Sequence, residues 1–358
     1  MLDKNFFKNL KCELKQAENS GKRIIFTFSS TSKQKDRGYL TPSRQVNNSW
    51  LFGCVLFDQN DVYEILKYVD GVADIILADT EKKIPIRIDH NESAKDNETI
   101  GYAQTGNLSK ICFDNCKITK VMEFKPNDIT VNAAWTYISQ KLNYCSGKKI
   151  AILGSGNIGS KLALKLVECG AEIHIYRRNQ YKGHKISEGL NAIKTLGTMS
   201  SVQYTENPLI AAHCADVIIG TSSGEPIIDA NIVCCLKKTG IIIDLGKNSF
   251  TKDAISLAIK NCVETYRVDI TAAIEGFVYE IDRSIELKES SYGRRKLDKY
   301  YIVSGGFMGL DGDFIVDNIK NPNKVVGIAD GLGDVKRNTS KLEENSIKKL
   351  EDIISKNP

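Results

Sequence analysis

The sequence lacks the marks of several protein classes. No apolar run approaches the roughly 18 residues that a membrane-spanning helix needs. The first residues, MLDKNFFKNLKCELKQ, lack the apolar core of a signal peptide. Lysines and arginines are scattered along the chain rather than gathered in one arm, so the net charge of +5 does not indicate nucleic-acid binding. We therefore expect a cytoplasmic protein with no membrane and no nucleic-acid partner.

Cysteine and histidine do not occur at the spacings of metal ligands. None of the ten cysteines belongs to a C-x-x-C pair, and the four histidines are scattered. A cysteine in an apolar segment usually acts as a small buried hydrophobic residue. Without a secretion signal, we expect reduced thiols rather than structural disulfides. We also predict that the protein has no metal site.

The composition is that of an ordinary globular protein. Of the 358 residues, 42% are apolar and 26% are charged, and these fractions are typical of soluble globular domains. A chain of this length would stretch a single hydrophobic core, because cores stop growing beyond roughly 250–300 residues. We therefore expect more than one domain.

The stretch from residue 148 to residue 179 organises the rest of the chain. It opens with the apolar run IAIL at residues 150–153, which is typical of a strand buried on both faces of a parallel sheet. A helix then runs to Gly170, and a second strand covers residues 172–176. Between the first strand and the helix lies a G-x-G-x-x-G pattern, formed by Gly154, Ser155, Gly156, Asn157, Ile158 and Gly159.

Each glycine of this pattern has a physical reason. Gly154 allows a tight turn, Gly156 lets a pyrophosphate approach the backbone, and Gly159 lets helix and strand pack closely. The helix N-terminus offers free N–H groups and a positive dipole end to the phosphates. Because the pattern follows a strand, opens a helix and leads to a second strand, it predicts dinucleotide binding. The alternative is a tight turn between strand and helix that binds nothing.

Four further strands complete a predicted six-stranded sheet, at residues 201–204, 216–220, 241–245 and 263–269. With helical crossovers they form a doubly wound sheet, which binds ligands outside the carboxyl ends of its strands. Three turns are then expected along one cleft, at residues 221–224, 246–248 and 269–271.

The first 128 residues predict a smaller α/β domain. A helix at residues 2–20 precedes strands at residues 23–28, 50–57 and 73–78, and the last two strands enclose a helix in a βαβ unit. We expect irregular β structure at residues 100–124 and a long polar connection at residues 29–49. Long connections are often functional, and we propose that Arg37 or Arg44 holds a carboxylate or phosphate of the substrate. The alternative is a solvated loop.

These patterns divide the chain into four parts. We predict an α/β substrate domain at residues 1–128, a connecting helix at 129–146, and an NAD(P)-binding Rossmann domain at 147–275. Residues 276–358 are expected to form helices and glycine-rich loops, the loops at 301–313 and 327–334, which pack back on the cleft. The fold class is therefore α/β, with a C-terminal doubly wound Rossmann sheet preceded by a smaller α/β domain.

Residues 148–269, about a third of the chain, resemble a known family group. ILGSGNIGSKLALKLVECGAEIHIYRRN, then ADVIIGTSSGEPIID and GIIIDLG, are similar to the amino-acid-dehydrogenase-like dehydrogenases. That group includes shikimate dehydrogenase, glutamyl-tRNA reductase, methylenetetrahydrofolate dehydrogenase and alanine dehydrogenase. The resemblance implies an N-terminal substrate domain and a nicotinamide cofactor, whose ribose lies near the turn at residues 221–224 with Thr221, Ser222 and Ser223. Gly246, in a second turn along the same cleft, is a further predicted cofactor-binding residue. The first 145 residues carry neither N-V-T-x-P-x-K nor an S-C-N-R-type segment, so the resemblance implies no particular substrate.

The end of the second strand of this domain predicts NADP rather than NAD. An NAD site usually carries Asp or Glu there, to bind the ribose 2′-hydroxyl. Here the chain reads Tyr-Arg-Arg-Asn, with Arg177 and Arg178 and no acid. Arginines are planar, permanently charged donors that suit the 2′-phosphate of NADP. The alternative is that both arginines simply face solvent. NAD is the less favoured of the two cofactors.

Hydride transfer to a carbonyl or imine needs a proton donor near the nicotinamide. Lys247 directly follows the fifth strand of the domain and is the candidate by position. Asp269 follows the sixth strand and is placed to orient this lysine. The alternative is that Asp269 or Thr271 caps the following helix.

The sequence thus predicts an NADP-dependent oxidoreductase that acts on a small polar metabolite in an interdomain cleft. Two other interpretations stay open. One is a non-catalytic NAD(P)-binding sensor, in which nucleotide drives domain closure and a partner reads the result. The other is an enzyme that keeps NAD tightly bound and uses it transiently, as S-adenosylhomocysteine hydrolases do. We expect a small-molecule substrate and a homo-oligomer such as a homodimer.

Overall fold

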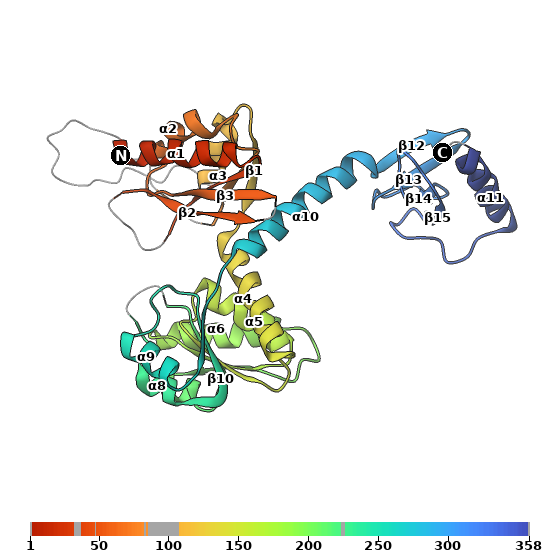
Figure 1. The fold of residues 1–358 in the computed structure, drawn as a ribbon. Helices are drawn as coiled ribbons and strands as arrows, with labels where there is room; N and C mark the ends of the chain where they lie inside the picture. Colours follow the sequence, from red (N-terminus) through yellow and green to blue (C-terminus); the bar gives the residue numbers. More distant parts are fainter. Residues whose placement is uncertain are drawn as a thin grey trace. The chain divides into compact units, whose positions relative to one another are not determined.

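The computed structural model describes residues 2–31, 37–46, 48–81, 84, 107–222 and 226–356. The chain divides into two compact units, residues 1–275 and residues 276–358. The first unit carries two β-sheets and the second carries another. Figure 1 traces the elements of both units in chain order.

The first sheet lies in residues 23–124 and has the spatial order β2-β3-β1-β4-β5. Its strands are β1 (Arg23–Ser29), β2 (Tyr39–Val46), β3 (Ser49–Val55), β4 (Ile75–Asp79) and β5 (Lys120–Phe124). Neighbours pair parallel except β2, which pairs antiparallel with β3. The helices of this domain are α1 (Lys4–Asn19), α2 (Asn60–Val69) and α3 (Asn107–Asn115). They contribute to one core with the strands, where Phe26 packs edge to face on Phe28 and Phe52.

The structure differs from the sequence prediction at two places in this domain. Residues 39–46, expected within a polar connection, form the edge strand β2. Its register against β3 shifts between Thr41 and Arg44, and an edge strand accepts a proline such as Pro42 at such an irregularity. Residues 107–115, expected to be β-rich, form α3, because buried Leu108 and Ile111 recur at helical rather than strand spacing.

The second sheet is parallel throughout and has the spatial order β11-β10-β9-β6-β7-β8. Its strands are β6 (Lys149–Leu153), β7 (Glu172–Tyr176), β8 (Val202–Thr205), β9 (Ala215–Gly220), β10 (Leu236–Asp244) and β11 (Glu264–Arg267). Its helices are α4 (Pro126–Leu142), α5 (Asn157–Glu168), α6 (Gln180–Ile193), α7 (Pro208–Ala212), α8 (Ala230–Cys234) and α9 (Lys252–Lys260). This order is the Rossmann arrangement. The predicted α/β class, with a Rossmann sheet preceded by a smaller α/β sheet, is confirmed.

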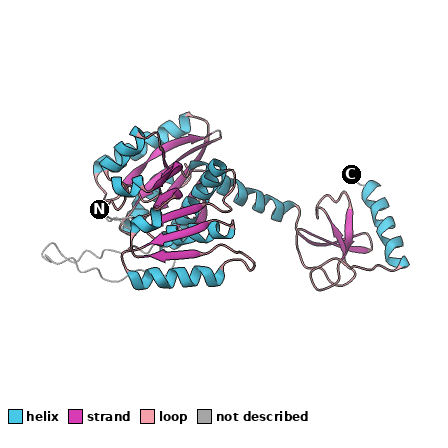
Figure 2. Cartoon of the chain, turned by 90° about the horizontal axis from the view of Figure 1, so that it is seen from below, coloured by secondary structure: helices cyan, strands magenta, loops and turns pink. Residues whose placement is uncertain are grey.

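The central strands of the Rossmann sheet bury both faces. Along β6, Ile150 and Ile152 belong to one core with α4 and α5, whereas Ala151 and Leu153 belong to another with α7, α8 and α9. Successive side chains of a strand point to opposite faces, so a strand covered on both sides reads as a continuous apolar run. Figure 2 shows the helices that flank the strands. This double burial explains why the strand was recognisable in the sequence.

The helix α6 begins earlier than the sequence suggests. The basic, glycine-containing composition of residues 177–185 favours a loop, but α6 starts at Gln180 with Asn179 as its cap. The side chain of Asn179 accepts a hydrogen bond from the main-chain N–H of Lys182 at 2.9 Å. Gly183 lies within α6 rather than in a loop. A side chain at this position would clash with Tyr204, because its Cβ would lie 2.2 Å from Cε2 of that residue. This glycine therefore lets the helix approach β8.

Residues 276–358 contain a four-stranded sheet that the sequence reading missed. The last elements of the chain are α10 (Thr271–Ser290), β12 (Gly293–Leu297), β13 (Tyr300–Ser304), β14 (Phe314–Val316), β15 (Val325–Ile328) and α11 (Lys341–Lys356). Tyr300 and Phe314 of the sheet share a core with Leu350 and Ile354 of α11. The expected glycine-rich loops at 301–313 and 327–334 are therefore partly strands. The prediction that this part packs back on the cleft remains a prediction.

Three general features accompany the fold. Across the described ranges, no helix has both the length and the apolar character needed to cross a membrane. In the same ranges, no group of three or more His, Cys, Asp and Glu side chains is arranged to hold a metal ion. All ten cysteines are free thiols.

Candidate dinucleotide-binding site

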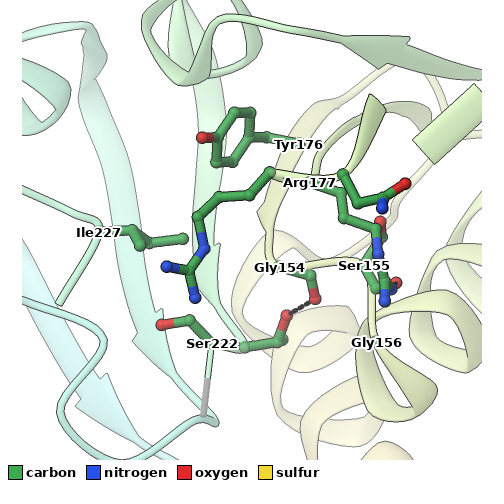
Figure 3. Close-up of a pocket in the computed structure, with 10 residues that line it drawn as sticks. Gly154, Ser155, Gly156, Tyr176, Arg177, Ser222 and Ile227 are labelled. Atoms are coloured by element: carbon green, nitrogen blue, oxygen red, sulfur yellow. Dashed lines mark hydrogen bonds between the residues drawn. The ribbon is translucent and has the colours of Figure 1, made fainter. Parts of the chain in front are cut away.

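A pocket opens at the carboxyl ends of β6, β7 and β9, with a volume of about 300 Å³ (Figure 3). The position is the switch point of the Rossmann sheet, where the connections from neighbouring strands leave in opposite directions and ligands bind. The lining comes from the glycine-rich loop, the end of β7 and the turn after β9. It consists of Gly154, Ser155, Gly156, Tyr176, Arg177, Arg178, Asn179, Thr221, Ser222 and Ile227.

Two of the three glycines are required by the protein's own packing. Gly154 has a φ of +114°, in the region that favours glycine, and a Cβ there would lie 2.9 Å from the main-chain nitrogen of Ser222. A Cβ at Gly159 would lie 2.5 Å from the carbonyl oxygen of Gly154 and 2.9 Å from Oγ1 of Thr221. The two glycines therefore allow α5 to approach the ends of β6 and β9.

Gly156 differs from the other two glycines. In the described structure, a Cβ at Gly156 would meet no heavy atom within 4 Å. Gly156 is also the N-cap of α5, and no side chain caps this helix end. An uncapped helix N-terminus with open space beside its first turn suits the pyrophosphate of a dinucleotide.

Hydroxyl groups of the lining hold the loop and offer further contacts. Thr221 donates a hydrogen bond from its hydroxyl to the carbonyl oxygen of Gly154, and this bond joins the turn after β9 to the glycine-rich loop. The hydroxyl oxygens of Ser155 and Ser222 are buried and have no hydrogen-bond partner in the described part of the chain. Buried hydroxyls usually have a partner, so these two fit a site that a polar ligand completes.

The end of β7 makes one edge of the pocket positive. Arg177 is half-buried and donates from Nη1 to the carbonyl oxygen of Ser155. Arg178 is exposed, and among the described residues its guanidinium forms neither an ion pair nor a hydrogen bond. No carboxylate is among the described residues that line the pocket. The edge where an NAD site usually carries an acid therefore carries two guanidinium groups instead.

The turn after β10 carries Gly246 and Lys247. A Cβ at Gly246 would lie 2.1 Å from the carbonyl oxygen of Ser222, so the turn after β10 closely approaches the turn after β9. The carboxylate of Asp244 fixes this turn by accepting hydrogen bonds from the main-chain N–H of Gly246 at 3.0 Å and of Asn248 at 3.1 Å. Lys247 is exposed, with a left-handed φ of +58°.

The carboxylate of Asp269 lies at the start of α10 and is already engaged. It accepts hydrogen bonds from the main-chain N–H of Thr271 at 2.8 Å and from its hydroxyl at 2.5 Å. These bonds outweigh the opposing effect of burial and hold the pKa of Asp269 below its usual value. The carboxylate of Asp269 thus binds Thr271, the first residue of α10. That Asp269 also orients Lys247 stays a prediction.

The two arginines proposed for the substrate lie in different surroundings. Arg44, on β2, brings Nε to 4.0 Å from Oδ1 of Asp269, and therefore faces the Rossmann domain. Arg37 is 66% exposed and pairs with Asp3 at 3.3 Å, next to the start of α1. The structure thus brings one of these arginines to the Rossmann domain. Ser223, proposed as a cofactor ligand, lies outside the described residues.

Sequence reasoning missed a charged cluster beside the glycine-rich loop. Lys161, on α5, forms ion pairs with Asp128 of α4 and, at 3.3 Å, with Glu81 that follows β4. The other oxygen of Glu81 accepts the main-chain N–H of Asn127 at 2.6 Å. Burial opposes ionisation of Asp128, but hydrogen bonds from Lys161 and Lys125 hold its pKa below the usual value. The cluster joins the first sheet to α4 and α5, and no local sequence pattern predicts it.

Comparison with known proteins classifies the central part of the chain. Residues 149–244 match the family model described as NADP oxidoreductase coenzyme F420-dependent. The match runs from β6 to the end of β10, which is the part that carries the pocket. This segment is therefore a Rossmann domain of the NAD(P)-binding type. Because it makes up less than half of the chain, the match does not assign the whole protein to a family.

Solved structures give weaker similarities. A dipicolinate synthase structure from Bacillus halodurans is 13% identical over 73% of this chain and 97% of its own, with a TM-score of 0.34. CAD from Helicobacter pylori complexed with NADP(H) is 18% identical over 44% of each chain, with a TM-score of 0.33. Lactate dehydrogenase from Cryptosporidium parvum is 21% identical over 28% of this chain and 37% of its own, with a TM-score of 0.25. At these TM-scores the similarities support no inference about activity.

The contrast between the glycines gives a testable prediction. Gly156→Ala places its methyl group where no described protein atom lies, so we expect the free energy of unfolding to fall by no more than about 1 kcal/mol, the preference of an N-cap for glycine over alanine. The methyl group fills the space for the pyrophosphate, so we expect nucleotide affinity to fall by at least about tenfold. Gly159→Ala instead forces α5 away from β6 and should destabilise the domain by about 1–3 kcal/mol.

Urea unfolding and calorimetric titration with NADPH measure these two effects on the same variants. Gly189→Ala is the matched control, because a Cβ there also meets no heavy atom within 4 Å, but Gly189 lies on α6 and outside the pocket lining. Unchanged nucleotide affinity in Gly156→Ala would contradict this assignment of the pyrophosphate position.

Proposed function

We propose that the protein is an NADP-dependent oxidoreductase that acts on a small polar metabolite. The proposal is carried by one observation: the described lining of the pocket at the switch point has two guanidinium groups and no carboxylate. An arginine donates two parallel hydrogen bonds to a phosphate, which a ribose 2′-hydroxyl cannot accept in the same way. The family match at residues 149–244, whose description names NADP, supports the same cofactor.

The residues present fit a dinucleotide. Gly156 and the N-terminus of α5 would hold the pyrophosphate, Arg178 the 2′-phosphate, and Ser222 the part of the cofactor next to β9. Arg177 has a second role, because its bond to the carbonyl of Ser155 also holds the glycine-rich loop. When bound, the nicotinamide supplies or accepts a hydride. The protein contributes binding and orientation and moves the accompanying proton.

We assign the proton to Lys247. The lysine follows β10 in a turn that contacts the turn after β9, where the family resemblance expects the nicotinamide ribose. We propose that its ammonium reaches the reacting group from this turn. An ammonium group next to the reacting carbonyl or imine donates a proton as hydride arrives on the carbon. We propose that Asp269 acts on the substrate side of the site together with Arg44, whose Nε lies 4.0 Å from Oδ1 of Asp269. Arg44 is the candidate to hold a carboxylate or phosphate of the substrate.

The cofactor assignment predicts different effects for the two arginines. Arg178→Ala should weaken NADPH binding by about tenfold or more and leave NADH binding unchanged, since it removes only a charged hydrogen bond to the 2′-phosphate. Arg177→Ala should weaken both nucleotides, because the glycine-rich loop also loses a donor. Calorimetric titration of each variant with both nucleotides measures these changes. Arg283→Ala, which removes an exposed arginine paired with Glu286 on α10, is the control. Equal losses for NADPH and NADH in Arg178→Ala would refute the 2′-phosphate assignment.

The catalytic assignment predicts a loss of turnover without a loss of binding. Lys247→Met should lower the rate of NADPH oxidation by at least about 100-fold, the usual contribution of a positioned acid, while NADPH affinity stays unchanged. The measurement is absorbance of NADPH with a panel of small polar carbonyl and imine compounds. Lys252→Met, on the exposed start of α9, is the control. Full turnover in Lys247→Met would exclude this lysine as the proton donor. A wild-type protein that binds NADPH but reduces nothing in the panel would favour the sensor interpretation.

A further inference from the structure

Cysteines come together at the amino ends of β9 and β10, at the edge of the Rossmann sheet away from the pocket. Cys214 directly precedes β9, and Cys235 directly precedes β10. The two strands pair in parallel, with Ala215 opposite Leu236. Cys214 and Cys235 are therefore the residues one step before this pair. Cys234, the last residue of α8, lies beside them in the sequence.

A main-chain hydrogen bond fixes how far apart the two cysteines lie. The N–H of Cys214 donates to the carbonyl oxygen of Cys235 at 2.8 Å. With standard covalent dimensions on either side of this bond, the two Cα atoms lie within about 6.7 Å of each other. Native disulfides join residues whose Cα atoms are about 4.4–6.8 Å apart. The pair therefore meets the distance requirement without movement of the strands.

The two thiols are also chemically available. Cys214 is exposed and Cys235 is partly exposed, whereas Cys54, Cys112 and Cys145 are buried. Nε2 of His213 lies 3.5 Å from Sγ of Cys214, which places a proton acceptor beside that thiol. Thiols become reactive when a neighbouring group favours the thiolate. Cys214 is therefore the thiol placed to react first.

We propose that Cys214 and Cys235 form a reversible disulfide when the protein meets a peroxide. The thiol of Cys214 gives its proton to His213, and its sulfur attacks a peroxide oxygen. With hydrogen peroxide, the O–O bond breaks, one oxygen stays on Cys214 as a sulfenic acid, and the departing hydroxide takes the proton back from His213 and leaves as water. The thiol of Cys235 then attacks that sulfur, the S–S bond forms, and the sulfenic oxygen leaves as a second water. Two thiols are thus oxidised and one peroxide is reduced, and an external dithiol reverses the change by exchange.

The disulfide has a structural consequence for the pocket. The loop that it closes contains β9 and the turn that follows, which includes the pocket-lining residues Thr221, Ser222 and Ile227. Oxidation therefore cross-links the two ends of the segment that carries this wall of the pocket. Formation of the bond does not depend on which nucleotide the pocket binds.

Peptide mapping of the full-length protein tests the proposal. Reduced protein is treated with hydrogen peroxide, digested without reductant and analysed by mass spectrometry. We expect a peptide pair joined through Cys214 and Cys235, lighter by two hydrogen atoms than the separate peptides and released by dithiothreitol. Cys214→Ser and Cys235→Ser should each lose the joined peptide. Cys262→Ser is the matched control and should keep it, because Cys262 is exposed like Cys214 and has a similar left-handed φ, +54° against +52°.

Other products would overturn the proposal. A bond between Cys234 and Cys235, or between Cys145 and Cys169, would show that another pair reacts. A bond between two copies of the chain, or oxygen added to Cys214 with no bond, would show that Cys235 does not reach it. Circular dichroism of the serine variants checks their folding, so loss of the joined peptide in a folded variant is attributable to the thiol.

Discussion

The close approach of α5 to the ends of β6 and β9 is the constraint on which the site depends. Gly159 has no room for a side chain against the carbonyl of Gly154 and the hydroxyl of Thr221. The same threonine donates a hydrogen bond to that carbonyl. The helix end, the glycine-rich loop and the turn after β9 are therefore locked together. This arrangement leaves Gly156 and an uncapped helix N-terminus facing open space, which is the geometry that binds a pyrophosphate.

The rest of the domain supports this arrangement by burial and charge. The central strands bury opposite faces in two separate cores, so the sheet is fixed from both sides. Lys161, on α5, also fixes this helix through ion pairs with Asp128 and Glu81. The side chain of Glu81 is only 9% exposed. A buried carboxylate needs ionic or hydrogen-bonding partners. Ion pairs between defined residues thus link the first sheet to α5.

Local patterns made the Rossmann sheet and the glycine-rich loop predictable. Strands covered on both faces read as apolar runs, and the three glycines stand at fixed offsets from β6 and α5. Where structure depends on distant partners, the sequence reading failed. β2 is held by pairing with β3, and its proline and polar residues resembled a loop. The strands of residues 293–328 were not recognised because glycines interrupt them, and α3 was not recognised within a stretch predicted to be irregular β structure.

The site shows the same division. The residues of the loop and of the β7 end follow one another in the chain, so their grouping could be predicted from spacing. The bond from Thr221 to Gly154 and the pairing of Lys161 with Glu81 join residues far apart in sequence, and no local pattern contains them. The pairing of Arg44 with Asp269 also crosses between domains.

One measurement tests the central claim most directly. The unmodified protein is titrated separately with NADPH and NADH, following the nicotinamide fluorescence, and bound NADPH is then displaced with 2′,5′-ADP or with 5′-AMP. A pocket edge with two guanidinium groups, and with no acid among its described residues, predicts that NADPH binds at least about tenfold more tightly than NADH. It also predicts that 2′,5′-ADP displaces it at far lower concentration than 5′-AMP does. Equal binding of the two nucleotides, or binding of neither, would contradict the account.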